Sequence, residues 1–292
     1  KMNVKEFIDL HVHIGPEIFP RKFTVQTLIR KERGKINGMA LKNHLYPTMP
    51  LINSVENDKE IVLIGSVTLN NYLGGLNPDA IYASAKISEL PIIVWFPTIN
   101  ADNFLKQSRH EIPLEWVSKD FKSRLSKDVK GIKIVNDDGK LTGDTIKVLE
   151  AIKENDCILA TGHVSWQEAE ELVKTAVEMK IKRIIITHPI YQLIDMPVEV
   201  QRVLVKNPGV FVEQNYAMFL IDKIPIEKIA EQIKAIGADN CIISSDMGQI
   251  SSPSPSDGMG EFVKLLLEQG ISEEDIKTMG ERNPKKLIER SS

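Results

Sequence analysis

Residues 157–188 read CILATGHVSWQEAEELVKTAVEMKIKRIIITH, and they contain a strand, a helix and a second strand in succession. The runs CILA and RIIIT are apolar and of strand length. Between them lies an apolar stripe at helical spacing, formed by Leu172, Val173, Ala176 and Val177. A helix that joins two strands in this way makes the strands parallel. The stretch therefore predicts a βαβ unit of a parallel sheet.

The same alternation of short apolar runs and helical segments continues through the whole chain. Nine runs have strand character, and the last four open near residues 157, 184, 210 and 241, about one strand and one crossover helix apart. Strands that are apolar along their whole length fit a parallel sheet covered on both faces. No strand is followed by a GxGxxG or GxxxxGK(S/T) loop. The sequence predicts one α/β domain over residues 2–292, a (β/α)8 barrel in preference to an open doubly wound sheet.

The nine runs exceed the eight strands of a closed barrel by one. The best candidate for the surplus is GIKIV, because residues 131–142 have the pattern of a β-hairpin that turns at Asp137-Asp138-Gly139. Under the alternative, GIKIV is itself a barrel strand and another run is peripheral. The choice decides which run is the fourth strand.

The composition narrows the classes of function. The chain has 292 residues, of which 42% are hydrophobic and 26% are charged, and its formal net charge is -3. This balance offers no basic surface for nucleic acid, and no apolar run approaches the roughly 20 residues that span a bilayer. Two cysteines exclude a disulfide framework. We expect a cytoplasmic protein that acts on a small molecule, that binds neither nucleic acid nor membrane, and that can form a homo-oligomer.

Polar side chains able to bind a metal follow several of the apolar runs. His11 and His13 end the first run, and alternate residues of a strand face the same side. His163 and His188 end two consecutive later runs, and Asp246 ends the last one. In a parallel barrel, the carboxyl ends of the strands form the face that carries active sites. Imidazole and carboxylate groups there predict a divalent metal site, most readily for zinc, with manganese, nickel or iron as alternatives.

This order of residues resembles the amidohydrolase superfamily of metal-dependent hydrolases. The segment NPKKLI at residues 283–288 is similar to the NPA-type segment that often begins the final helix of those proteins. The segments GGLNP, VWFPT, ATGH and THP resemble an uncharacterised branch of the superfamily. The resemblance implies a distorted (β/α)8 barrel with one or two divalent metals at the mouth.

The resemblance also implies a role for each candidate ligand. His11, His13 and Asp246 would hold the first metal. His163 and His188 would hold a second metal. In a mononuclear site, His163 would instead bind the first metal and His188 would stabilise the substrate.

A lysine that bridges two metals has two candidates in this sequence. Binuclear members of the superfamily usually carry a carboxylated lysine on strand four. If GIKIV is the fourth strand, Lys133 matches that bridge. If GIKIV is a hairpin, PIIVWFPT is the fourth strand and contains no lysine, so that Lys42 is the other candidate. Lys42 alternates with His44, and we expect both to face the site, His44 as a substrate contact.

Further candidate substrate contacts lie near the same face. Glu17 and Arg21 follow the first run, and Arg21 could pair with a carboxylate or phosphate. Glu213, Asn215 and Tyr216 lie at the end of the run that begins VFV.

The sequence therefore predicts a metal-dependent hydrolase of a small polar substrate with an amide, lactone, ester or phosphoester bond. A bound divalent metal lowers the pKa of its water to about 7, and Asp246 is expected to be the general base for that water. The metal, joined by His188 in a mononuclear site, would polarise the oxygen of the scissile bond. The alternatives are a metal-dependent decarboxylase of the same superfamily, a phosphoesterase of the histidinol-phosphatase type, and a non-catalytic barrel that binds a metal or ligand.

Overall fold

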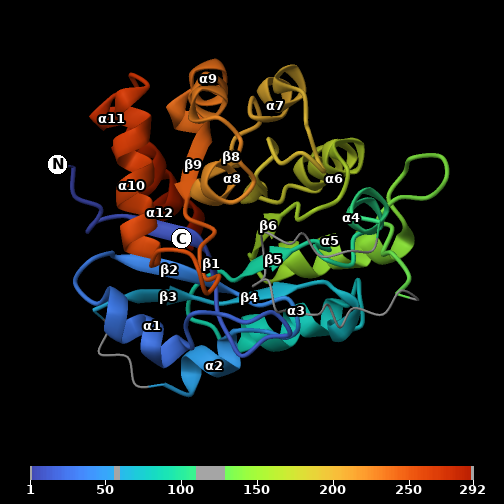
Figure 1. Ribbon diagram of the computed structural model, residues 1–292. Coiled ribbons are helices and arrows are strands. Elements are labelled where there is room, and N and C mark those ends of the chain that lie inside the picture. The colour runs from blue at the N-terminus through green and yellow to red at the C-terminus, as the bar shows by residue number, and fades with distance from the viewer. Residues whose placement is uncertain (1, 56–59, 110–128, 291–292) are drawn as a thin grey trace.

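The computed structural model describes residues 2–55, 60–109 and 129–290. Parallel strands lie at the centre of the molecule and helices surround them (Figure 1). The strands are β1 (Ile8–His13), β2 (Gly38–Lys42), β3 (Val62–Ile64), β4 (Ser66–Thr68), β5 (Ile93–Trp95), β6 (Ile158–Ala160), β7 (Ile184–Ile186), β8 (Val210–Asn215) and β9 (Cys241–Ser244).

These strands occupy eight positions of a parallel barrel, because β3 and β4 are one strand interrupted at Gly65. The strand order is β1-β2-β3 and then β4-β5-β6-β7-β8-β9, so that each strand pairs with its sequence neighbour. Between the last strand and the first, two backbone hydrogen bonds close the circle. The amide of His13 donates to the carbonyl of Met247 (2.8 Å), and the amide of Asp246 donates to that of His11 (2.9 Å). The fold is the predicted (β/α)8 barrel.

Residues 131–142 form the predicted hairpin and do not belong to the barrel. An antiparallel bridge joins Val135 to Leu141, and a single parallel bridge joins Ile132 to Ala101. The fourth strand of the barrel is therefore β5, from the run PIIVWFPT, and it contains no lysine.

Helices cover the outside of the barrel, with α1, α2 and α3 on one side of the strands in Figure 1 and α6, α7, α9 and α10 on the other. Within the described ranges, no helix is both long and apolar enough to cross a membrane. The α-helices are α1 (Val25–Glu32), α2 (Met49–Asn53), α3 (Pro78–Lys86), α4 (Asp102–Gln107), α5 (Gly143–Glu154), α6 (Trp166–Glu178), α7 (Val198–Leu204), α8 (Tyr216–Leu220), α9 (Ile226–Ile236), α10 (Pro255–Glu268), α11 (Glu273–Lys277) and α12 (Asn283–Ile288). Shorter helical turns are η1 (Asn71–Leu73), η3 (Ala238–Asn240) and η4 (Thr278–Arg282).

Strand side chains alternate between two apolar layers, one inside the barrel and one beneath the helices. Ile93, Ile158 and Ile242 belong to the interior layer, together with Leu287 and Ile288 of α12. The neighbouring strand residues pack against the buried stripes of the helices. Because both faces of the strands are covered, most strand residues are apolar, as the sequence pattern indicated, and the polar ones gather toward the carboxyl ends.

An irregularity in β1 positions the candidate site. The pairing register of β1 with β2 shifts between Asp9 and Val12. Leu10 packs in the interior layer, whereas Val12, which strict alternation would place beside it, packs in the outer layer. Such a bulge reverses the alternation of a strand. It brings His11 into the interior, where its ring centroid lies 4.5 Å from that of Trp95.

Candidate metal centre

The carboxyl ends of the strands surround a polar cavity. Each strand that was predicted to end in a candidate ligand delivers that side chain to this end of the barrel, as parallel pairing requires. The cavity is lined by His13, Lys42, His44, His163, His188 and Asp246, together with residues of the following loops.

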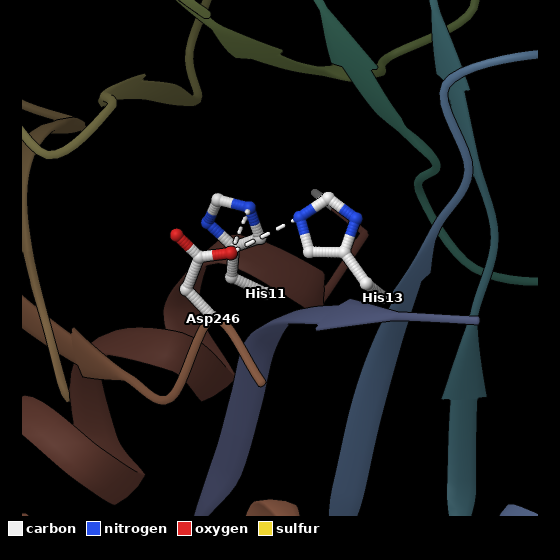
Figure 2. A group of neighbouring side chains, drawn as sticks. All are labelled: His11, His13 and Asp246. Atoms are coloured by element: carbon white, nitrogen blue, oxygen red, sulfur yellow. Dashed lines mark ion pairs between the residues drawn. The ribbon is translucent and has the colours of Figure 1, made fainter. Parts of the chain in front are cut away.

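His11, His13 and Asp246 form a compact group beside this cavity, with both rings turned toward the carboxylate (Figure 2). The Nε2 atoms of His11 and His13 lie 3.2 and 3.0 Å from Oδ1 of Asp246. One ligand atom from each residue lies within 4.8 Å of the other two, and all three residues are buried. Among the residues that the structure describes, they are the one group of His, Cys, Asp and Glu with this spacing.

The protonation of this group fits a cation. Burial lowers the pKa of His11 and of His13 well below the usual value, which keeps both imidazoles neutral. Nδ1 of His11 lies 2.9 Å from Oε1 of Glu213, and in the tautomer that donates to this carboxylate Nε2 carries the lone pair. That lone pair faces the Asp246 carboxylate, which is also an acceptor. The Nζ atom of Lys42 lies 3.0 Å from the same Nε2 atom of His11. Burial raises the pKa of the Asp246 carboxyl well above its usual value, and a bound cation would hold this group in its ionised form. Neutral imidazoles and an ionised carboxylate arranged in this way are ligands of the kind that a divalent metal requires.

His163 and His188 lie beside this group and belong to the same cavity. Their ring centroids are 5.1 Å apart, and the ring of His188 is 5.9 Å from that of His11. Burial lowers the pKa of His188 to about 3, so that this ring is neutral as well. Its Nδ1 atom is buried without a hydrogen-bond partner within the described part of the chain. This placement is compatible with both predicted roles, ligation of a second metal and contact with the substrate.

Of the two candidate bridging lysines, the structure brings only Lys42 to the site. Lys42 ends β2 and is 1% exposed, and its Nζ lies 4.1 Å from the ring centroid of Trp95. Burial lowers its pKa to about 8. The alternative prediction, that Lys133 is the bridging lysine, is wrong. Lys133 belongs to the hairpin outside the barrel, its side chain is 54% exposed, and it faces Asp137. The surplus run was the hairpin, so the lysine in it cannot reach the mouth.

Two of the candidate residues have unusual backbone conformations. Asp246 has a φ of 54° and His188 has a φ of 22°, in a region that residues with a Cβ rarely adopt. Such conformations cost about 1–3 kcal/mol each and gather at functional sites. Two of the candidate ligands are therefore among the residues of this barrel that hold a strained backbone.

Glu213 holds the group together in a way that the sequence did not reveal. Its Oε1 accepts hydrogen bonds from Nδ1 of His11 (2.9 Å) and from the hydroxyl of Ser244 (2.6 Å). Its Oε2 accepts from the backbone amide of His188 (3.2 Å). One buried carboxylate thus orients His11 and fixes the chain at His188. Sequence spacing predicted that Glu213 lies near the mouth, but not that it contacts two candidate ligands.

We expect Glu213→Gln to weaken zinc binding about 10- to 100-fold, because partners that orient metal-binding histidines have effects of this size. Competition with a chromophoric chelator measures the Kd. Glu32→Gln is a matched control, since Glu32 is a buried glutamate of α1 that accepts from the amide of Ser256 (3.0 Å) away from the cavity. An unchanged Kd in Glu213→Gln would contradict the role assigned to this residue.

The candidate substrate contacts fall into three groups. Arg21 and His44 line the cavity, and Glu17 pairs with Arg21. Asn215 contacts the group of three, because its amide donates to Oδ2 of Asp246 (3.3 Å). The prediction that Tyr216 contacts the substrate is wrong, because Tyr216 does not line the cavity.

The Tyr216 ring packs between helices, 5.9 Å from the ring of Phe262 in α10, and the structure does not bring it to the cavity. The reason is that β8 ends at Asn215, whose side chain caps α8, so that Tyr216 starts a helix instead of extending the strand. The sequence missed Tyr191, which lines the cavity with its ring 5.7 and 5.5 Å from those of His163 and His188. Its position three residues after His188 was the available signal.

Comparison with known families places the chain among related proteins. Residues 6–213 match a family model whose description is "Family of unknown function (DUF6282)". The chain belongs to this family. The DUF6282 match includes the four histidines that are candidate metal ligands, together with His44 and Lys42, and Asp246 lies beyond it. Among curated proteins, none matches this DUF6282 chain.

Solved structures show the same fold. An amidohydrolase from Pseudomonas aeruginosa has a TM-score of 0.63 at 10% identity, covering 97% of this chain and 95% of the other. A putative 2-pyrone-4,6-dicarboxylic acid hydrolase from Pseudomonas putida has a TM-score of 0.58 at 12% identity, covering 98% of each chain. A 2,6-dihydroxybenzoate decarboxylase from Rhizobium has a TM-score of 0.50 at 11% identity, also covering 98% of each. The predicted resemblance to the amidohydrolase superfamily is thus confirmed in the fold.

Proposed function

We propose that this protein is a metal-dependent hydrolase of a small polar substrate, acting on an amide, lactone, ester or phosphoester bond. The observation that carries the proposal is the buried group of His11, His13 and Asp246, whose ligand atoms lie within 4.8 Å of one another at the mouth of the barrel. An enclosed structural site would not need an adjoining cavity, whereas a catalytic site keeps a position open for water or substrate.

These three residues would hold the first divalent ion, and zinc is the first choice. Such an ion lowers the pKa of a bound water and polarises a carbonyl or phosphoryl oxygen. Asp246 would act as the general base: it takes a proton from the attacking water and returns it to the leaving group. His188, neutral and beside the same cavity, would donate a hydrogen bond to the oxygen of the scissile bond.

The number of ions depends on His163, His188 and Lys42. A binuclear site would use both histidines for a second ion, with carboxylated Lys42 as the candidate bridge. A mononuclear site would leave Lys42 as an amine and His188 as a substrate contact.

A metal-dependent decarboxylase is the second candidate, and one observation favours it. The fourth strand, β5, carries no lysine, so the bridge that is usual in binuclear hydrolases of the resembled superfamily is missing from its expected place. A mononuclear site would fit either reaction.

Activity of the metal-loaded chain separates these candidates. We expect zinc- or manganese-loaded protein to hydrolyse at least one member of a panel of amides, lactones, carboxylic esters and phosphate esters. Removal of the metal by a chelator should abolish turnover, and return of the metal should restore it. Release of CO2 from carboxylic acids without hydrolysis would support the decarboxylase instead. Metal binding with neither reaction would overturn both and leave a ligand-binding barrel.

A further inference from the structure

Arg21 presents unused hydrogen-bond donors to the candidate site. It follows β1, and it lines the same cavity as His13 and Asp246. Its side chain is 5% exposed. Nε donates to Oε2 of Glu17 (2.5 Å), and among the described residues no acceptor contacts either terminal nitrogen. A guanidinium has five donors in a planar fork, so most of its hydrogen-bonding capacity is left for something in the cavity.

The surroundings of Arg21 hold the fork in place. The Glu17 side chain is itself fully buried, and its Oε1 accepts from the backbone amide of His44 (2.9 Å). The guanidinium carbon lies 5.7 Å from the ring centroid of Phe19. The backbone of the segment is tied to the loop after β9, because Arg21 forms an antiparallel bridge with Gln249. A rigid fork loses little conformational entropy when it binds a ligand.

The chemistry of this fork selects its ligand. The terminal nitrogens of Arg21 have no acceptor among the described residues, so an acceptor that enters the cavity can form charge-assisted hydrogen bonds with them. Two parallel N–H groups match the two oxygens of a carboxylate or phosphate, and the positive charge strengthens both bonds. Lys42 adds a second buried cation to the same cavity.

We infer that Arg21 forms an anion subsite, so that the substrate carries a carboxylate or phosphate group in addition to the bond that reacts. That the bound anion is a substrate rests on the proposed function, whereas the anion subsite itself depends only on the residues of the cavity. The substrate class narrows from small polar molecules to small anions.

Isothermal titration of the full chain with two probes, succinate and inorganic phosphate, tests the subsite with and without bound zinc. We expect at least one probe to bind, and the two titrations distinguish a carboxylate site from a phosphate site. Arg21→Lys keeps a positive charge beside Glu17 but loses the fork, and it should weaken binding about 10- to 100-fold, as expected for hydrogen bonds to a charged group. Arg202→Met, which removes an exposed arginine of α7, should bind as the wild type does.

A second variant covers the case in which Arg21→Lys fails to fold. Arg21→Met/Glu17→Gln removes both charges of the buried pair and leaves no unpaired carboxylate, and it should lose the same affinity. Binding of neither probe, or full affinity in a folded Arg21 variant, would overturn the subsite. Metal binding without anion binding would leave the proposed hydrolase intact, whereas Arg21-dependent anion binding without metal binding would refute only the hydrolase.

Discussion

The double variant His11→Ala/His13→Ala is expected to lose stoichiometric metal binding and at least about 1,000-fold in kcat/KM. Both imidazoles direct Nε2 at Oδ1 of Asp246, and their removal leaves a single carboxylate of the group of three. The chemistry that an ion contributes is worth several kcal/mol in the transition state, and each 1.36 kcal/mol is a factor of ten in rate. Metal content by elemental analysis and turnover of the best substrate measure the effect.

His44→Ala is the matched control for this experiment. His44 is a buried histidine of the same cavity, but its Nδ1 lies 2.9 Å from the hydroxyl of Thr98 and it is not a member of the group of three. The His44→Ala variant should bind metal as the wild type does, whatever the effect of the substitution on substrate binding. Circular dichroism of both variants shows whether the fold is retained. If a folded double variant keeps its metal and its activity, the ligand assignment is wrong.

Asp246→Asn is expected to lower kcat about 100- to 10,000-fold, the range that general acid–base catalysis contributes. The amide has nearly the shape of the carboxylate and can still contact Asn215, but it cannot accept and return a proton. The rate must be measured at saturating metal, because the variant also replaces a candidate ligand. A KM that changes little, beside a large loss in kcat, is the expected pattern.

Asp222→Asn provides the comparison for that variant, since Asp222 is another aspartate that lines the cavity. Its substitution should have a much smaller effect on kcat than Asp246→Asn. Equal losses in the two variants would argue that the cavity needs negative charge and that Asp246 is not a general base.

The architecture and the location of the site could be read from the sequence for a simple reason. In a parallel barrel each strand delivers its last residues to the same end, so the runs that end at His13, His163, His188 and Asp246 specified the common face without any knowledge of packing. The hairpin was also recognisable, because residues 131–142 carry turn residues between two short apolar segments. Local pattern was sufficient wherever backbone direction alone decides the position of a side chain.

Contacts that depend on register or on distant segments could not be predicted. The bulge in β1 lies between Asp9 and Val12 and separates Leu10 from Val12, so that His11 and His13 both face the interior, and nothing local marks it. The bond between His11 and Glu213 joins residues that are 202 positions apart. Tyr216 was misplaced because the chain turns into α8 directly after Asn215, and the ring then packs against α10. Each of these features is decided by tertiary packing, which a single sequence does not display.

The amount of metal per chain is the most direct measurement, made by elemental analysis on protein purified without a chelator and then incubated with zinc or manganese. We predict about one or two equivalents. Two would support a second ion at His163 and His188, and one would support a mononuclear site. No bound metal under any of these conditions would contradict the proposal that the group of His11, His13 and Asp246 is a metal centre.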